Sequence, residues 1–212
     1  MLYGELPEVT LTNGEKAKGF TFKIPSPAKS AVLRLPTNQE MLDRLNKHKS
    51  IRRTIGRRQS QTESVPNLKA DLDLFNAIRL EGPDFDEFEA AVALGKITSN
   101  EVTDCERVGD QYRVTLKTAF GITTHTLNIP SQRDITVYRR SVVSSIDLPH
   151  NCEEIRFRTE PAVALYNAVV TDFTGYAESY KPEDVPPHHK SSVVIELIQA
   201  IEELDSSLDP NS

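Results

Sequence analysis

The sequence has no tryptophan and only two cysteines, and both scarcities narrow the class of protein it can belong to. Aromatic residues make up 7% of the 212 positions, so the cores must be mainly aliphatic and modest in size. Small cores of this kind often gain stability from a neighbouring unit or a partner. Cys105 and Cys152 do not have a metal-binding spacing and are too few for a disulfide scaffold, which favours a reducing compartment.

Long apolar runs and an excess of positive charge are also missing. No run approaches 18 apolar residues, so we expect no membrane-spanning helix. Residues 1–5 lack the basic and apolar regions of a signal peptide, and we therefore expect no secretion. The formal net charge of -6 excludes a global field that would draw the protein to nucleic acid or acidic lipid.

Sequence patterns of catalysis are scarce too. The chain has nine glycines, and it contains no nucleophile-elbow motif, no phosphate-binding P-loop and no glycine-rich dinucleotide turn. His188 and His189 precede a helix, but adjacent helical residues point in different directions, and no other ligands at metal-binding spacing support them. His125 lies in an alternating strand and is predicted to be structural. We predict no catalytic residue, no metal ligand and no cofactor.

The strongest positive feature is a self-similarity at a spacing of 94 residues. When the chain is shifted by 94 positions, 4 identities fall within the 21 positions from Phe20 to Glu40. The identical pairs are Thr21 with Thr115, Lys23 with Lys117, Leu33 with Leu127, and Pro36 with Pro130. This spacing exceeds the roughly 20–50 residues of solenoid repeats, so each copy is expected to be a small domain. The alternative is that two hairpins followed by helices look alike through patterning alone.

Local signals predict what each copy contains. Asn13-Gly14 interrupts two alternating segments, residues 9–11 and 20–24, and this dipeptide is a strong hairpin signal. A third strand is predicted over residues 31–35. In the second copy, Gly109-Asp110 is the predicted turn.

A helix is predicted to follow the third strand in each copy. Thr37 and Glu40 have the spacing of a capping box, in which the hydroxyl and the carboxylate each bind a backbone amide at the start of the helix. Ser131 and Asp134 repeat this junction. Further helices are predicted from residue 68, from residue 84, from Pro161 and over residues 188–204, with an extra strand over 154–159.

These signals predict an α+β fold of two tandem similar units. Residues 1–98 form the first unit and residues 99–212 the second, which ends in an amphipathic helix. Each unit should hold a small antiparallel hairpin or three-stranded sheet with two to three packed helices.

A basic segment lies between the first helix and a polar stretch, residues 59–67, that reads as a mobile loop. Between Asp43 and Glu63 the chain contains no acidic residue, so this segment could offer an electrostatic contact to a partner. No aromatic residue interleaves it for base stacking. The alternative is a solvated helix end and a flexible loop. The candidate contact residues are Arg44, Lys47, Lys49, Arg52, Arg53, Arg57 and Arg58.

Three features together resemble tail assembly chaperones and related minor morphogenesis proteins of tailed phages and prophages. They are Lys23-Ile24-Pro25, the segment Leu33-Arg34-Leu35-Pro36-Thr37 and the acidic final helix. The resemblance implies a non-catalytic protein of the bacterial cytoplasm or the virion. It would hold aggregation-prone partners, such as a tail tape-measure protein. The doubled unit departs from the single-domain pattern of that family.

We therefore predict a non-enzymatic protein-interaction or assembly protein with a protein partner, such as a tail or other phage structural protein. One alternative is a nucleic-acid-binding accessory protein that uses the basic segment 44–58. Another is a small metal-dependent enzyme built around His188, His189 and nearby acids.

Overall fold

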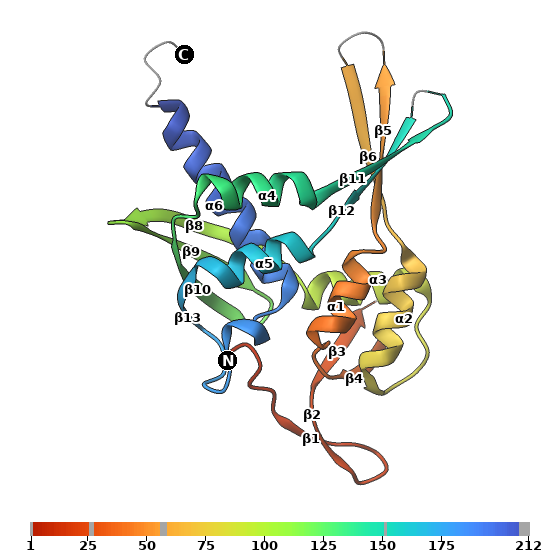
Figure 1. Ribbon diagram of the computed structural model, residues 1–212. Coiled ribbons are helices and arrows are strands. Elements are labelled where there is room, and N and C mark those ends of the chain that lie inside the picture. The colour runs from red at the N-terminus through yellow and green to blue at the C-terminus, as the bar shows by residue number, and fades with distance from the viewer. Residues whose placement is uncertain (1, 26–27, 56–58, 151, 208–212) are drawn as a thin grey trace.

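The computed structural model describes residues 2–25, 28–55, 59–150 and 152–207, and in these ranges the chain has a mixed α+β fold with antiparallel sheets (Figure 1). The sheets have the strand orders β1-β2, β3-β4-β7, β11-β12-β5-β6 and β13-β10-β9-β8. No helix in the described ranges has the length and apolar character that crossing a bilayer requires.

The first half of the chain builds a three-stranded sheet that is covered by helices. The small hairpin β1–β2 precedes it and turns at Asn13-Gly14, as the sequence predicts. Its second strand is not the predicted segment 20–24, because that segment lies in β3 and pairs with β4. The elements are β1 (Glu8–Thr10), β2 (Lys16–Lys18), β3 (Phe20–Pro25), β4 (Ala28–Leu33), α1 (Asn38–Leu45), β5 (Lys49–Ile55), β6 (Gln59–Val65), α2 (Leu68–Ile78), β7 (Arg79–Glu81) and α3 (Glu87–Ile97).

The second half builds a four-stranded sheet with helices packed on it. The turn between its first two strands falls at Gly109-Asp110, also as predicted. The elements are β8 (Asn100–Val108), β9 (Gln111–Thr118), β10 (Gly121–Asn128), α4 (Gln132–Val142), β11 (Val143–Leu148), β12 (Cys152–Phe157), α5 (Glu160–Val169), β13 (Val170–Thr174), the short 3-10 helix η1 (Pro182–Asp184) and α6 (Pro187–Ser207).

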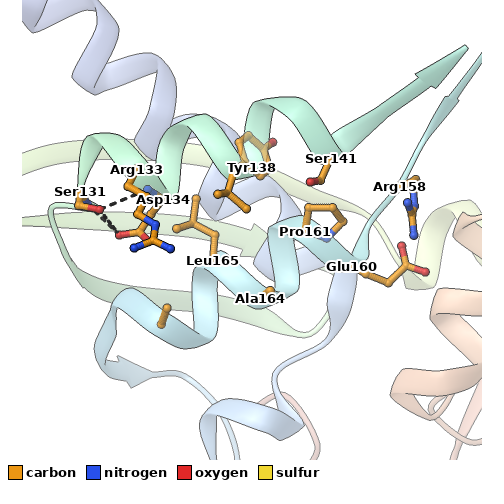
Figure 2. A pocket seen from close by; sticks show the side chains of 12 residues that line it. Ser131, Arg133, Asp134, Tyr138, Ser141, Arg158, Glu160, Pro161, Ala164 and Leu165 are labelled. Atoms are coloured by element: carbon orange, nitrogen blue, oxygen red, sulfur yellow. Dashed lines mark hydrogen bonds between the residues drawn. The ribbon is translucent and has the colours of Figure 1, made fainter.

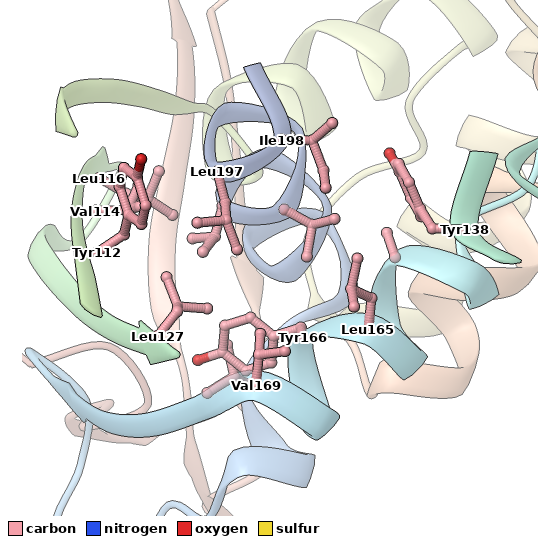
Figure 3. Packing of buried hydrophobic residues seen from close by; sticks show 14 of the residues in the cluster. Tyr112, Val114, Leu116, Leu127, Tyr138, Leu165, Tyr166, Val169, Leu197 and Ile198 are labelled. Atoms are coloured by element: carbon pink, nitrogen blue, oxygen red, sulfur yellow. The ribbon is translucent and has the colours of Figure 1, made fainter. Parts of the chain in front are cut away.

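Two hydrophobic clusters form the described core. One draws its fully buried members from residues 24–97, and Leu33 and Phe75 are completely enclosed in it. The other draws its members from residues 112–201, with Tyr3 added from the start of the chain. In this second cluster, alternate residues of β9 and β10 face α5 and α6 (Figure 3). Alternation places every second strand side chain on the same face, which is why a period of two in the sequence gives a one-sided core.

Two structural details recur 94 residues apart. Capping boxes start α1 at Thr37 and Glu40 and α4 at Ser131 and Asp134. A register shift follows Val32 in the pairing of β4 with β7, and one follows Thr126 in the pairing of β10 with β13.

The two halves are joined by side-chain contacts as well as by strand pairing. The Asn46 amide donates to Glu160 Oε1 at 2.6 Å, and its Oδ1 accepts from the Thr159 amide at 3.4 Å. Asn38 donates to the Glu183 carbonyl at 2.7 Å. The start of α1 and the turn after it therefore face residues from the last quarter of the chain.

Three expectations from the sequence need correction. Residues 59–67 were expected to be a mobile loop, but Gln59–Val65 forms strand β6, paired with β5 along its whole length. The third strand of the first half covers Ala28–Leu33 and not residues 31–35. Each half was expected to hold only one small sheet, whereas β5, β6, β11 and β12 combine into a further four-stranded sheet. The missed strand β6 is mostly polar, and β11 has apolar residues at irregular spacing, so neither shows the apolar alternation that indicates a half-buried strand.

Candidate interaction surface

The sheet β11-β12-β5-β6 is assembled from two hairpins that lie far apart in the sequence. The β5–β6 hairpin extends away from the helices, and the β11–β12 hairpin lies beside it (Figure 1). The joint is an antiparallel pairing of β12 with β5, in which Cys152 lies opposite Arg53 and Ile155 opposite Ser50. The two outer strands, β6 and β11, are the edges of this sheet.

Opposite charges stabilise the joint. Lys49 Nζ on β5 lies 2.6 Å from Glu154 Oε2 on β12, and Arg52 Nη1 lies 3.4 Å from Glu153 Oε2. Arg156 also contacts Glu154, at 2.7 Å. Hydrogen bonds from Lys49 and Arg156 lower the pKa of Glu154, so this carboxylate stays charged at neutral pH. The basic strand of one half thus pairs with the acidic strand of the other.

Large apolar side chains are exposed around the β11 edge. Val143, Ile146 and Leu148 on β11 are 42%, 55% and 36% exposed, and Phe157, which pairs with Val143, is 55% exposed. Val137 on the neighbouring helix α4 is 57% exposed. Single exposed apolar residues are ordinary on protein surfaces, but a group of them around one sheet edge makes this edge a candidate interaction surface.

A groove of about 860 Å³ lies between α4 and α5, next to this edge (Figure 2). Because α4 runs directly into β11, and β12 leads to Arg158 at the end of the groove, the groove and the edge form one continuous surface. Its apolar lining includes Val137, Tyr138, Pro161, Ala164, Leu165 and Ala168, and its polar lining includes Ser131, Arg133, Asp134, Ser141, Arg158 and Glu160.

The predicted basic contact residues do not form one surface. Arg44 is enclosed, with its side chain 12% exposed and its Nε 2.6 Å from Asp71 Oδ1. Lys49 and Arg52 contact Glu154 and Glu153 across the joint of the sheet.

Of the others, Lys47 is exposed in the turn after α1, and Arg53 is exposed on β5 beside Gln61. Arg57 and Arg58 lie outside the described residues. Among the described members of the basic segment, Lys47 and Arg53 are therefore the cations for which the structure shows no ion pair with another described residue.

Two of the histidines singled out by the sequence, His125 and His189, lie in a buried polar network, whereas neither ring nitrogen of the buried His188 has a hydrogen-bond partner among the described residues. His125 Nδ1 is 2.7 Å from the Tyr166 hydroxyl, and the Tyr176 hydroxyl is 2.8 Å from His189 Nδ1. Burial lowers the pKa of His125 to about 3, and burial with the nearby Arg44 charge lowers that of His188 to about 3. These imidazoles are neutral at physiological pH.

This network is enclosed by the protein fold. His188 and His189 are 8% and 0% exposed at the start of α6, where helix α1 and the second core enclose them. Lys190 follows, with Nζ bound by Asn167 Oδ1 at 2.9 Å and the Glu183 carbonyl at 3.2 Å. Across the described ranges, no group of three or more His, Cys, Asp or Glu residues is placed to hold a metal ion.

The sequence did not reveal β11 and its exposed apolar residues. A usable local signal was present, because Pro149 cannot donate a strand hydrogen bond and separates two short segments that contain isoleucine or valine. In the structure His150 has a φ of 63°, as a tight turn requires. Exposure of Val143 and Ile146 could not be read from the sequence, since apolar residues usually indicate a buried face.

We found no match to this chain among protein-family models, curated proteins or solved structures.

Proposed function

We propose that this protein is a non-enzymatic interaction protein that takes part in assembly by receiving a protein segment along the β11 edge and the adjoining α4–α5 groove. The observation that carries the proposal is the unpaired, apolar edge of β11 next to that groove. An exposed strand edge offers backbone amides and carbonyls in a fixed row, and a partner strand can satisfy them by extending the sheet.

The groove adds side-chain selectivity to backbone pairing. Its floor of Pro161, Ala164 and Leu165 suits apolar side chains, and Arg158 and Glu160 provide polar contacts at one end. Strand pairing supplies affinity that depends little on sequence, whereas pockets for side chains supply specificity. A partner segment with alternating apolar residues would use both.

As part of this proposal, residues 1–98 and 99–212 are two copies of one ancestral unit. The support is that the capping boxes at Thr37 and Ser131 and the register shifts after Val32 and Thr126 all recur with the same spacing of 94. The order of hairpin, helix, hairpin, helix, strand and helix also runs from β3 to α3 and again from β9 to α6.

The resemblance to phage tail assembly chaperones extends the proposal to the kind of partner. A protein of this type would hold a structural protein of the tail, such as a tape-measure protein, until assembly. The net charge of -6 is consistent with a carrier that must itself stay in solution.

Site-specific photo-crosslinking in cells of the natural source tests the proposal. A photoreactive residue at Ile146 on β11 should give one discrete crosslinked protein, identified by mass spectrometry. The matched control is Ile122, which is 67% exposed at the start of β10, away from this sheet. The proposal fails if Ile146 gives no crosslink, or gives the same set of products as Ile122.

A further inference from the structure

The joint between the two hairpins leaves two unlike edges on the sheet. The second strand of one hairpin, β12, pairs with the first strand of the other, β5. The strands left outside are the first strand of the later hairpin, β11, and the second strand of the earlier one, β6. A two-fold arrangement of the hairpins would have left two equivalent strands outside. The contact inside the chain is therefore head to tail.

A head-to-tail contact can be repeated. When the same kind of interface joins successive copies, it gives a ring if the rotation closes and a filament if it does not. Within the sheet every neighbouring pair is antiparallel, so strand direction alternates from β11 through β12 and β5 to β6. If a second copy places its β11 next to β6, the alternation continues, and the new pair is antiparallel as well.

The two edges have few of the features that keep natural sheet edges apart, with one acidic residue on each. Proteins protect such strands with lysine, proline, bulges or a covering element. The segments Gln59–Val65 and Val143–Leu148 contain no lysine, arginine or proline. The pairings of β5 with β6 and of β11 with β12 run without a register shift.

Charge also permits the two edges to meet. β6 carries one acidic residue, Glu63, and β11 carries one, Asp147, so repulsion between the strands is limited to a single pair. Their other polar residues are serine, threonine and glutamine, which pair across strands through hydrogen bonds. Ile146 and Val143 would lose solvent exposure on pairing, a gain of about 25 cal/mol for each Å² of apolar surface buried.

We propose that the partner of the β11 edge is the β6 edge of a second copy of this chain, so that copies join head to tail through a continuous antiparallel sheet. This inference rests on the strand-pairing part of the proposed function, since it names the partner that the β11 edge receives. The mostly polar β6 would not fill the α4–α5 groove. The internal joint of β12 with β5 is the template, and the contact between copies extends the same sheet.

The test uses the purified full chain and two edge variants. Thr62→Asp adds a second acid to β6, and Ser145→Asp adds a second acid to β11. In each variant, repulsion between the acids should prevent one of the two edges from pairing. The control is Thr103→Asp, which makes the same change of charge on β8, the edge strand of the other four-stranded sheet. Sedimentation velocity over a wide range of protein concentration measures the mass, and circular dichroism checks that each variant is folded.

The unmodified chain and Thr103→Asp should form species of at least twice the mass of one chain at high concentration. Thr62→Asp and Ser145→Asp should each remain single chains. An equimolar mixture of the two should form a species of twice the single-chain mass and nothing larger. In that mixture, one variant supplies an intact β11 and the other an intact β6.

The inference is overturned if the unmodified chain stays a single chain at all concentrations, or if either edge variant alone assembles like the control. Assembly of both variants with themselves would indicate a two-fold contact elsewhere. The proposed function has a separate outcome, because Ile146 could still crosslink to a different protein in cells. That result would retain the interaction edge and assign it to another partner.

Discussion

The Tyr166 hydroxyl lies 2.7 Å from Nδ1 of His125, and both side chains are completely enclosed in the second core. His125 Nε2 lies 3.2 Å from the Thr123 hydroxyl on the same strand. The ring nitrogens of a buried histidine are thus satisfied by groups from α5 and β10. Because an unsatisfied polar atom in a core is costly, this pair should hold the helix on the sheet.

Replacing Tyr166 by phenylalanine should lower the free energy of unfolding by about 2 kcal/mol, since it leaves His125 Nδ1 buried without its partner. Urea unfolding followed by circular dichroism measures this value. Tyr138→Phe is the matched control, because Tyr138 is also a member of the second core but lies at the α4–α5 groove and is not a partner of His125. Equal effects for the two variants would contradict the structural role of the Tyr166 hydroxyl.

The buried histidines should make stability depend on pH. Burial lowers the pKa of His125 and of His188 to about 3 in the folded chain, whereas the unfolded chain takes up protons near the ordinary value of 6.5. The unfolded state therefore binds more protons below that value. Stability should be fully present above pH 6.5 and should fall towards pH 3, by about 1.4 kcal/mol per pH unit for each histidine.

Urea titrations at several pH values between about 7 and 5 test this dependence. His125→Leu should reduce the slope of unfolding free energy against pH, whatever its effect on absolute stability. His150→Leu serves as the control, because His150 is exposed and its removal should leave the slope unchanged. If both variants keep the original slope, His125 is not a source of the acid sensitivity.

Asp71 on α2 should contribute strongly to stability, because it is the buried partner of Arg44. Its carboxylate is 3% exposed and lies 2.6 Å from Arg44 Nε and 3.3 Å from His48 Nε2. Burial raises its pKa, but hydrogen bonds from His48 and Arg44 outweigh this effect and keep the pKa below the ordinary value.

Asp71→Asn should cost about 3 kcal/mol of unfolding free energy, because it leaves the enclosed Arg44 charge without its partner. Asp73→Asn is the control on the same helix. Asp73 is 53% exposed and pairs with Lys69, so its loss should cost less than about 0.5 kcal/mol. A small loss for both variants would mean that Arg44 finds another partner or water.

Gly175 lies where the chain passes close to β10. Its φ is +88°, and a Cβ placed there would meet the Ile122 carbonyl oxygen and the Cα of Thr123 well inside contact distance. Gly109 has a φ of +66°, with open space around it. Gly109→Ala should therefore cost only the left-handed backbone strain, about 1 kcal/mol.

Gly175→Ala should lower the free energy of unfolding clearly more than Gly109→Ala does, because the backbone of β10 must shift as well. The melting temperatures of the two variants provide the comparison. Similar melting temperatures would show that this part of β10 moves easily and that the close approach is not needed for folding.

The basic segment should not bind nucleic acid under physiological conditions. Glu154 and Glu153 neutralise Lys49 and Arg52, and Arg44 is enclosed. Fluorescence anisotropy with duplex DNA should therefore detect no binding at about 0.15 M salt. Binding that weakens steeply with salt and is lost in the double variant Arg52→Glu, Arg53→Glu would favour the nucleic-acid alternative.

Much of the local structure could be predicted from the sequence. The capping boxes at Thr37 and Ser131 start helices in the structure, and the turns at Asn13-Gly14 and Gly109-Asp110 are present. These signals succeed because a cap or a turn is decided by groups within about four residues of one another.

The candidate interaction surface was not predicted, for the same physical reason. Strand β6 contains mostly polar residues, and it is a strand because β5 satisfies its backbone groups. In turn, β5 is fixed by β12, which lies about 100 residues away along the chain. No local pattern reports a pairing over that distance.

By itself, the sequence determined the α+β class, the helix starts, several of the turns and the aliphatic character of the cores. Only the tertiary structure decided that Lys49–Ile55, within the basic segment, is a strand paired with an acidic strand, and that β6 and β11 are left as edges. Caps, turns and apolar spacing act within a few residues, whereas a strand becomes an edge or a centre only when the rest of the chain has packed.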